Sequence, residues 1–556
     1  MVRYIITLLK RLKYNLSHLF SKEKTIPDTS RLFNKIANNH TIDNFISEYF
    51  RDNVDSYDYG PKVFGIELWY PLGWVDISLL TPDGLRFSED IFSSYDFSSK
   101  KLKPAYFNIA DVKVPYELAR LQFIQKKINR HDIDMEIEVN NFPKIFWNSP
   151  MDVAIRNINL ILYQKWLKNY SGLHIINDGE ELSNEYISKH YEYIINNLEN
   201  TGNVVGNHYL IELTSILFTI ANYDFEDKQE HFELYHDELS KQLDAQFHLD
   251  GTNFEGSTHY SAFVVEALII CKLSIESIDH NSNLLPRIEK IIKTNRLFLS
   301  LLMNNNQLSQ IGDNDSGRLF YRQFDEENPL NMKWLLDLID YIYEGSLGGK
   351  EVSEKYKNEI NYEMPNFDEY KKVSHKPIPV FTKDYEAYSF IDFGMFIWRN
   401  EGEYFSIRCG PIGQNGVGGH SHYDQLAIEC FTRKDWIARD PGTGTYTNDI
   451  ELRNKFRSLE YHWGPKAKIK FPKEDEFSCF KLNHMSDGEV VSFDKNNFLG
   501  CAEFNGKRIY RKIRIDDGIV YIEDYSNDVE LEKYAAWGEG SEGVKVQFSE
   551  GYKRVR

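Results

Sequence analysis

The sequence predicts a multidomain α+β protein, with a helical first part followed by antiparallel β-structure. Apolar residues between positions 115 and 303 recur at the spacing of three and four residues that is typical of helices. Beyond position 380 the apolar spacing changes to two, the period of a strand. The chain has 556 residues, which is too long for one ordinary core, so we expect more than one domain.

The predicted helices follow one another through short loops. Proline is favoured in the first turn of a helix, so Pro115 in PYELARLQFIQKK and Pro150 in PMDVAIRNINLILYQKWLKN mark two helix starts. Helices joined by short loops become antiparallel neighbours. Further helices are predicted over residues 208–220, 230–247, 255–275 and 288–303, and short strands around 63–69.

The strands of the second part are predicted in YSFIDFGMFIWRN, EYFSIRCG, QLAIECFTR and DWIARD. Two tight hairpins are expected at Asn505-Gly506 and Asp517-Gly518, because these residue pairs tolerate the positive φ of two-residue turns. We therefore expect stacked antiparallel sheets. The predicted division is an N-terminal helical segment (1–60), a helical domain (61–345), a Gly-, Lys- and Glu-containing linker (346–379) and a β domain (380–556).

The composition narrows the function classes. The net charge of −19 argues against a nucleic-acid-binding protein. The five scattered cysteines lack the spacing of a disulfide framework or a cysteine zinc site. The apolar run over residues 4–9 is too short for a transmembrane segment and has no clear secretory cleavage site. The basic residues that follow it would suit a membrane surface, but an ordinary first helix is the simpler interpretation.

The first motif with chemical potential is GNHYLIE, which begins a predicted helix. Asn207 and His208 would lie at the helix N-terminus, where free backbone N–H groups favour anions. Asn207 would then donate a hydrogen bond to a substrate carboxylate. From the residues alone, a capping asparagine beside a surface histidine is the better explanation of the motif.

The second motif is DGTNFEGSTHYSAF, in which a polar loop leads into an apolar helix. His259 and Tyr260 lie at the junction. The Tyr260 phenol is a candidate general base or acid, provided that its surroundings lower its pKa. The alternative is a tyrosine that only packs in the core.

The third motif, GPIGQNGVGGHSHYDQLAIEC, is the most informative. On a strand, His420 and His422 would point to one face. Asp440 follows in the turn DPGTG, and His462 in LEYHWG is available as a third ligand. Because imidazole and carboxylate groups suit zinc, these residues predict a metal site.

Together these motifs resemble the heparinase II/III-like polysaccharide lyase family, whose members are similar to alginate lyases and heparan-sulfate lyases. GNHYLIE, NFEGSTHY, GGHSHYDQL with DPGTGTY, and LRNKFRSLEYH occur in the order of that family, and IGDNDSGR resembles a loop of some members. The resemblance covers about residues 111–462. It implies an incomplete (α/α) toroid followed by an antiparallel β-sandwich, with the active site in the cleft between them. It also implies β-elimination at a uronic acid.

The resemblance also implies roles for single residues. Asn207 or His208 matches the group that neutralises the substrate carboxylate, Tyr260 the catalytic tyrosine, and His420 a histidine that acts as base or stabilises charge. The ligands of a structural zinc ion, implied for part of the family, are matched by His422, Asp440 and His462. Weaker candidates for substrate binding are Glu255, His259, Arg318 and Arg457.

The acidic chain favours a substrate less charged than heparin, such as the uronate polymer of a bacterial capsule, O-antigen or exopolysaccharide. The resemblance implies the periplasm or cell envelope, whereas the lack of a clear signal peptide leaves the cytoplasm open. Two alternatives remain. One is an inactive carbohydrate-binding or polysaccharide-assembly protein on the same fold. The other is glycoside hydrolysis by a carboxylate pair, for which Asp313 and Asp315 are available.

Overall fold

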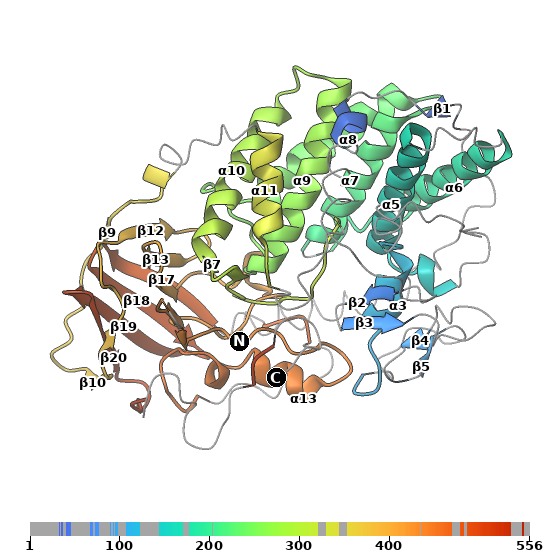
Figure 1. Ribbon diagram of the computed structural model, residues 1–556. Helices are drawn as coiled ribbons and strands as arrows, with labels where there is room; N and C mark the ends of the chain where they lie inside the picture. Colours follow the sequence, from blue (N-terminus) through green and yellow to red (C-terminus); the bar gives the residue numbers. More distant parts are fainter. Residues whose placement is uncertain are drawn as a thin grey trace, which may run out of the picture.

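The computed structural model has its long helices gathered on one side and its two large sheets on the other (Figure 1). The predicted α+β organisation is therefore confirmed. The structure describes residues 33, 35–36, 41–45, 67–70, 73–76, 89–90, 93, 95–97, 107–122, 144–170, 177–202, 204–320, 330–343, 353–433, 435–469, 479–482, 486–534 and 547–549. Among these residues, no helix combines the length and the apolar character that crossing a membrane requires.

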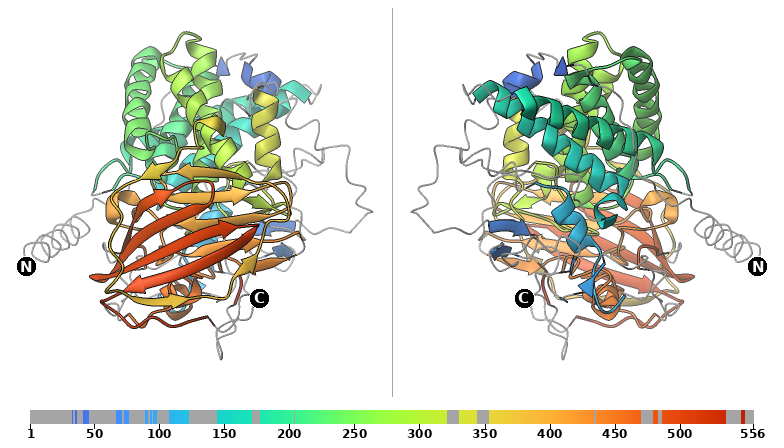
Figure 2. Two further views of the ribbon diagram at one scale, coloured as in Figure 1. Left: turned by 90° about the vertical axis from the view of Figure 1, so that its left-hand side faces the viewer. Right: turned by 90° about the vertical axis from the view of Figure 1, so that its right-hand side faces the viewer.

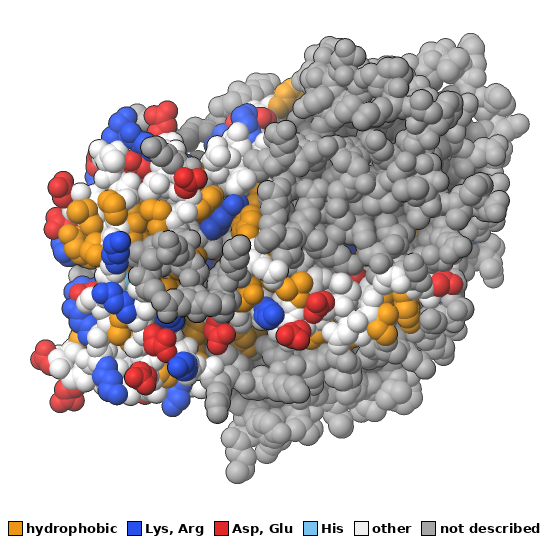
Figure 3. Space-filling view, turned by 60° about the horizontal axis from the view of Figure 1, so that its bottom comes forward, with side chains coloured by type: hydrophobic (Ala, Val, Ile, Leu, Met, Phe, Trp, Pro, Cys, Tyr) orange, Lys and Arg blue, Asp and Glu red, His pale blue; other side chains and the backbone are white. Residues whose placement is uncertain are grey.

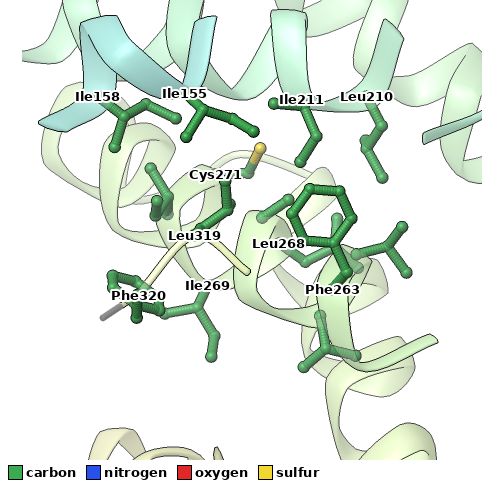
Figure 4. Packing of buried hydrophobic residues seen from close by; sticks show 14 of the residues in the cluster. Ile155, Ile158, Leu210, Ile211, Phe263, Leu268, Ile269, Cys271, Leu319 and Phe320 are labelled. Carbon is green, nitrogen blue, oxygen red and sulfur yellow. The ribbon is translucent and has the colours of Figure 1, made fainter. Parts of the chain in front are cut away.

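The helical part is built around α7 and α9, which are buried along most of their length. Helix α7 packs against α5 on one side and α9 on the other. Figure 4 shows Ile155 of α5, Ile211 of α7 and Leu268 of α9 in one apolar cluster. The helices are α3 (Lys113–Ala119), α5 (Pro150–Tyr170), α6 (Asn177–Asn196), α7 (Asn207–Asn222), α8 (Lys228–Gln246), α9 (Thr258–Ile278), α10 (Leu284–Leu302) and α11 (Lys333–Ile342).

The start of α9 is fixed by a side-chain cap. The Ser257 hydroxyl accepts a hydrogen bond from the backbone N–H of Tyr260, at 3.1 Å. Serine is a preferred N-cap because its side chain satisfies an N–H that the helix leaves free. The helix therefore begins three residues later than predicted, with Tyr260 in its first turn.

Two antiparallel sheets form the second part. The smaller sheet has the sequential order β12-β13-β14-β15-β16, with strands at Glu386–Phe390, Met395–Arg399, Tyr404–Arg408, Ile428–Phe431 and Trp436–Ala438. The larger sheet has the order β10-β20-β19-β18-β17-β9, and β11 also pairs with β20. Its strands are β9 (Ile360–Asn361), β10 (Lys371–Ser374), β11 (Ile378–Pro379), β17 (Ser486–Phe493), β18 (Asn497–Phe504), β19 (Lys507–Asp516) and β20 (Ile519–Ser526).

The smaller sheet is buried on both faces. Met395 and Ile397 of β13 join the helical core, whereas Phe396 and Trp398 join the core between the two sheets. This division follows from the alternation of side chains along a strand. The rings of Phe396 and Phe498 lie 5.1 Å apart across the sandwich. In the left view of Figure 2 the larger sheet faces the viewer, below the helices.

Both predicted hairpins are confirmed. Asn505 and Gly506 have φ values of 47° and 76° between β18 and β19, and Asp517 and Gly518 have values of 49° and 73° between β19 and β20. Two successive residues with positive φ match the right-handed twist of the flanking strands.

The predicted linker needs correction, and the predicted N-terminal segment lies mostly outside the residues that the structure describes. Part of the segment predicted as linker (346–379) is sheet, since β9, β10 and β11 occupy it. These strands are short and the side chains of β10 are mostly exposed, so their composition is typical of a loop. The predicted N-terminal helical segment (1–60) lies mostly outside the described residues. Its described part includes β1 (Lys35–Ile36), which pairs with β6 (Tyr223–Asp224).

Candidate active site

The site lies where the start of α9 meets two loops, residues 309–318 and 409–427. Gly312 has a φ of 67°, and a Cβ atom there would lie 2.5 Å from the Gly256 carbonyl oxygen and 2.6 Å from that of His420. Only glycine permits this approach. The Asp313 N–H also donates to the His420 carbonyl, at 2.8 Å. The helical and β parts are thus in backbone contact at the site.

Tyr260 and His420 form the centre of the site. Their rings stack with centroids 3.7 Å apart and an angle of 19° between the planes. The Tyr260 hydroxyl lies 3.4 Å from the hydroxyl of Tyr446. Burial raises the pKa of Tyr260 well above its usual value, and the carboxylates of Asp315 and Asp313 raise it further. The phenol is therefore protonated in the free protein at neutral pH.

Asn207 reaches the same place from the first residue of α7. Its side-chain amide donates to Glu255 Oε2 at 2.8 Å, and its backbone N–H donates to Glu255 Oε1 at 2.8 Å. Glu255 is fully buried, and its Oε2 atom lies 3.7 Å from Nε2 of His420. Three of the predicted residues are thus linked: Tyr260 stacks on His420, and Glu255 lies between His420 and Asn207.

His208 does not join this group. Its side chain is half-exposed, and its Nδ1 lies 2.8 Å from Oε2 of Glu199. The sequence left open which of Asn207 and His208 faces the site, and the structure places Asn207 there.

The two histidines of the third motif lie in a loop rather than on the predicted strand. Gly416 and Gly418 have φ values of 85° and 65°, which an extended strand does not accommodate. Both histidines still contact one carboxylate: His420 Nδ1 lies 3.1 Å from Asp313 Oδ2, and His422 Nε2 lies 2.9 Å from Asp313 Oδ1.

Asp313 is also bound by Arg453 of helix α13 (Ile450–Phe456), through two hydrogen bonds of 2.5 and 2.8 Å. Burial opposes ionisation of Asp313, but Arg453 and the two histidines hold its pKa well below the usual range. Asp313 is therefore a carboxylate, and its two oxygens are shared by three side chains.

His422, Asp440 and His462 lie together beside the Tyr260–His420 pair. His462 Nε2 is 3.3 Å from His422 Nδ1 and 3.4 Å from Asp440 Oδ2, and one ligand atom from each residue lies within 4.8 Å of the others. Zinc bonds of about 2.0–2.1 Å in a tetrahedron place neighbouring ligand atoms roughly 3.3–3.4 Å apart. These separations fit a zinc ion.

The outer nitrogens of the two histidines also have the partners that metal-binding histidines need. His422 Nε2 faces Asp313, and His462 Nδ1 lies 2.8 Å from the Ser458 carbonyl oxygen. Such partners fix the tautomer and direct the other nitrogen to the metal. The chemistry of the three ligands therefore suits zinc.

Replacing His422 by Ala is expected to remove bound zinc and to lower the Tm by several degrees, because the ion would hold three separate loops together. Metal analysis and thermal melts of the purified protein test this. His280→Ala, in the exposed loop after α9, should keep the zinc and the Tm of the wild type. Zinc retained by the His422 variant, or absent from the wild type, would contradict the assignment.

Three residues predicted to bind substrate, His259, Arg318 and Arg457, are buried. His259 is buried, with neither ring nitrogen hydrogen-bonded. Arg318 is buried against Met332 and lies over the ring of Trp334. Arg457 is buried and donates to the Cys479 carbonyl oxygen at 3.2 Å. All three side chains lie in the interior of the protein, and their substrate contacts stay a prediction.

Two neighbours of the site were not predicted: Tyr446 and Arg453. Tyr446 lies in the glycine-rich DPGTGTY stretch, which was the available signal. Arg453 lies in the LRNKFRSLEYH motif, which was the available signal for it. The hydrolase alternative loses its carboxylate pair, because Asp313 is fully engaged and Asp315 pairs with Lys113 at 3.2 Å.

Residues 382–462, which contain His420, His422, Asp440 and His462, match the family model described as Heparinase II/III-like, C-terminal. A crystal structure of heparinase III aligns with a TM-score of 0.54 at 13% identity, over 94% of this chain and 77% of that one. Heparan sulfate lyase HepC from Pedobacter heparinus aligns with a TM-score of 0.42 at 13% identity, over 91% and 73%.

A comparison with curated proteins found no match. The heparinase III alignment shows the fold and confirms the expected class, an incomplete (α/α) toroid followed by an antiparallel β-sandwich.

Proposed function

We propose that the protein, whose residues 382–462 match the Heparinase II/III-like C-terminal model, is a polysaccharide lyase that cleaves a uronic-acid-containing polymer by β-elimination. The observation that carries the proposal is the stacked Tyr260–His420 pair beside the Asn207 amide. These side chains come from both parts of the chain and offer a phenol, an imidazole and a hydrogen-bond donor around one position.

This reaction needs such a set of groups. The C5 proton of a uronate is very weakly acidic, because its loss places a second negative charge next to the carboxylate. An enzyme must therefore neutralise the carboxylate, accept the proton and protonate the leaving oxygen. A carbohydrate-binding protein would need none of these three functions together.

We assign the roles as follows. The Asn207 amide, which donates to both oxygens of Glu255 at 3.0 and 2.8 Å, turns from Glu255 to the substrate carboxylate and stabilises the charge that develops there. The C5 proton moves to Nε2 of His420, the C5–H electron pair forms the C4=C5 double bond, and the C4–O4 bond breaks. O4 takes its proton from the Tyr260 hydroxyl, which burial keeps protonated. The Tyr446 hydroxyl, 3.4 Å away, is placed to donate to the phenolate that remains.

Zinc, when bound, would supply a fixed centre for the loops of His422, Asp440 and His462. The proton transfers use only the side chains of the chain itself. We place the protein in the periplasm or cell envelope, where surface polysaccharides are accessible.

The charge distribution favours a substrate with carboxylates and few sulfates. Lys113 pairs with Glu117 and with Asp315, and Arg120 pairs with Asp152 at 2.6 Å, so these cations near the site are already neutralised. On the described part of the face in Figure 3, acidic and basic side chains are interspersed. We propose a capsule, O-antigen or exopolysaccharide as the substrate rather than heparin.

Incubation with a panel of uronate polysaccharides tests the proposal. The new double bond is conjugated with the carboxylate and absorbs in the near ultraviolet, so product formation is followed directly. Binding to a polymer without product would instead favour the inactive carbohydrate-binding alternative.

Replacing Asn207 by Ala should lower kcat by about 10²-fold, as expected when one donor to a developing oxyanion is removed. Steady-state kinetics on the active polysaccharide measure this. Asn196→Ala, at the exposed end of α6, serves as the control and should keep wild-type kinetics. A kcat equal to that of the wild type in the Asn207 variant would remove the assigned role.

A further inference from the structure

We infer that Asp313 is a positioning residue that couples the candidate zinc ligands His422, Asp440 and His462 to His420. The part of this inference that concerns catalysis rests on the proposed function. Asp313 is fully buried and lies between the two histidines of one loop. Its Oδ1 faces Nε2 of His422 at 2.9 Å, and its Oδ2 faces Nδ1 of His420 at 3.1 Å.

The main chain around Asp313 is tied to both catalytic elements. Its N–H donates to the His420 carbonyl at 2.8 Å, and its carbonyl accepts from the Ser257 hydroxyl at 2.6 Å. Ser257 also caps the helix that carries Tyr260. The carboxylate is therefore held at a fixed distance from both members of the stacked pair.

A single carboxylate at this position selects the tautomers of two histidines. It accepts the Nδ1–H of His420, which leaves the lone pair on Nε2, the nitrogen that takes the C5 proton in the proposed function and that lies 3.7 Å from Glu255 Oε2. It also accepts the Nε2–H of His422, which leaves the Nδ1 lone pair facing His462 and Asp440. The hydrogen bond that one ring nitrogen of a histidine makes determines whether the other ring nitrogen carries a proton. Arg453 compensates the buried charge with its two hydrogen bonds and keeps both oxygens as acceptors.

Asp313→Asn is the matched test, because it preserves shape and removes one acceptor. The two histidines contact different oxygens of Asp313, and an amide replaces one of these oxygens by an NH2 donor, so one histidine loses its acceptor. With zinc saturating, we expect kcat to fall by about 10²–10⁴-fold, the range found when an orienting carboxylate becomes an amide, with KM within about threefold. Zinc affinity, measured by chelator competition, should fall by about 10–100-fold.

A double variant separates positioning from general structural damage. If Asp313 acts through His420, adding Asp313→Asn to His420→Ala should lower the residual rate by less than about threefold. A full additional loss in that background would overturn the catalytic half of the inference. So would recovery of wild-type kcat by Asp313→Asn once zinc is saturating.

The zinc titration requires no substrate. An unchanged zinc affinity in Asp313→Asn would overturn the coupling, whether or not a substrate is known. If Asp313→Asn binds zinc more weakly but the wild-type protein is inactive on every polymer, the lyase proposal is refuted. The inferred link between Asp313 and zinc binding would then still stand. If Asp313→Asn does not fold, Arg453→Lys keeps the charge and loses the paired geometry. That variant should lower kcat about tenfold without changing KM, and an unchanged kcat would overturn the positioning role.

Discussion

Tyr260→Phe should reduce the rate of unsaturated product formation by at least about 10³-fold, because it removes the proton that the leaving oxygen takes. The substitution deletes one oxygen and keeps the ring that stacks on His420 at 3.7 Å. The fold should therefore persist, and the loss should appear in kcat. Near-ultraviolet absorbance with the active polysaccharide measures the effect.

Tyr446→Phe provides the matched control for this prediction. It removes the hydroxyl 3.4 Å from that of Tyr260 but leaves the proposed acid in place, so we expect a loss of only about tenfold. Equal activity of Tyr260→Phe and the wild type would remove the proton-transfer assignment. Equal losses in both variants would mean that the two phenols act as one unit.

The largest effect on stability is expected for Arg511→Met in the β domain. Arg511 donates to both oxygens of Asp524, at 2.7 and 2.8 Å, and to the carbonyls of Leu426 and Trp463, at 2.7 and 2.8 Å. Burial opposes ionisation of Asp524, yet Arg511 lowers its pKa to about 2. Removing one partner of a buried ion pair costs about 3–5 kcal/mol, because the other charge stays buried.

Hydrogen–deuterium exchange of peptides from β19 and β20 in increasing urea measures this cost locally. Arg514→Met is the control on the same strand. Arg514 pairs with Asp516 at 2.7 Å but is about half exposed, so its loss should cost less than about 1 kcal/mol. Similar shifts in the two variants would show that the buried network adds little to stability.

The sequence predicted the regular elements well because their signals are local. Helix α7 was expected at 208–220 and spans Asn207–Asn222, and both Asn-Gly and Asp-Gly turns formed as their backbone preferences require. The edge strands β9 to β11 escaped prediction, because short strands with exposed charged side chains resemble loops.

The site was less predictable, because it depends on contacts between distant segments. The motifs containing Asn207, Tyr260 and His420 were recognised, and the structure places them together. The strand expected at His420 is a loop, since the glycines before it adopt positive φ. Asp313 was considered only as a hydrolytic acid, because no local pattern reveals that a carboxylate will meet histidines more than 100 residues away.

The smaller sheet, which contributes to both hydrophobic cores, restricts how the helical and β parts can move relative to each other. Because Met395 and Ile397 belong to the helical core while Phe396 and Trp398 belong to the sandwich core, separating the two parts would expose apolar surface along a whole sheet. Such an interface resembles a domain interior more than the polar contacts that permit hinge bending. The helical and β parts therefore cannot swing apart as rigid bodies without exposing a buried face of this sheet.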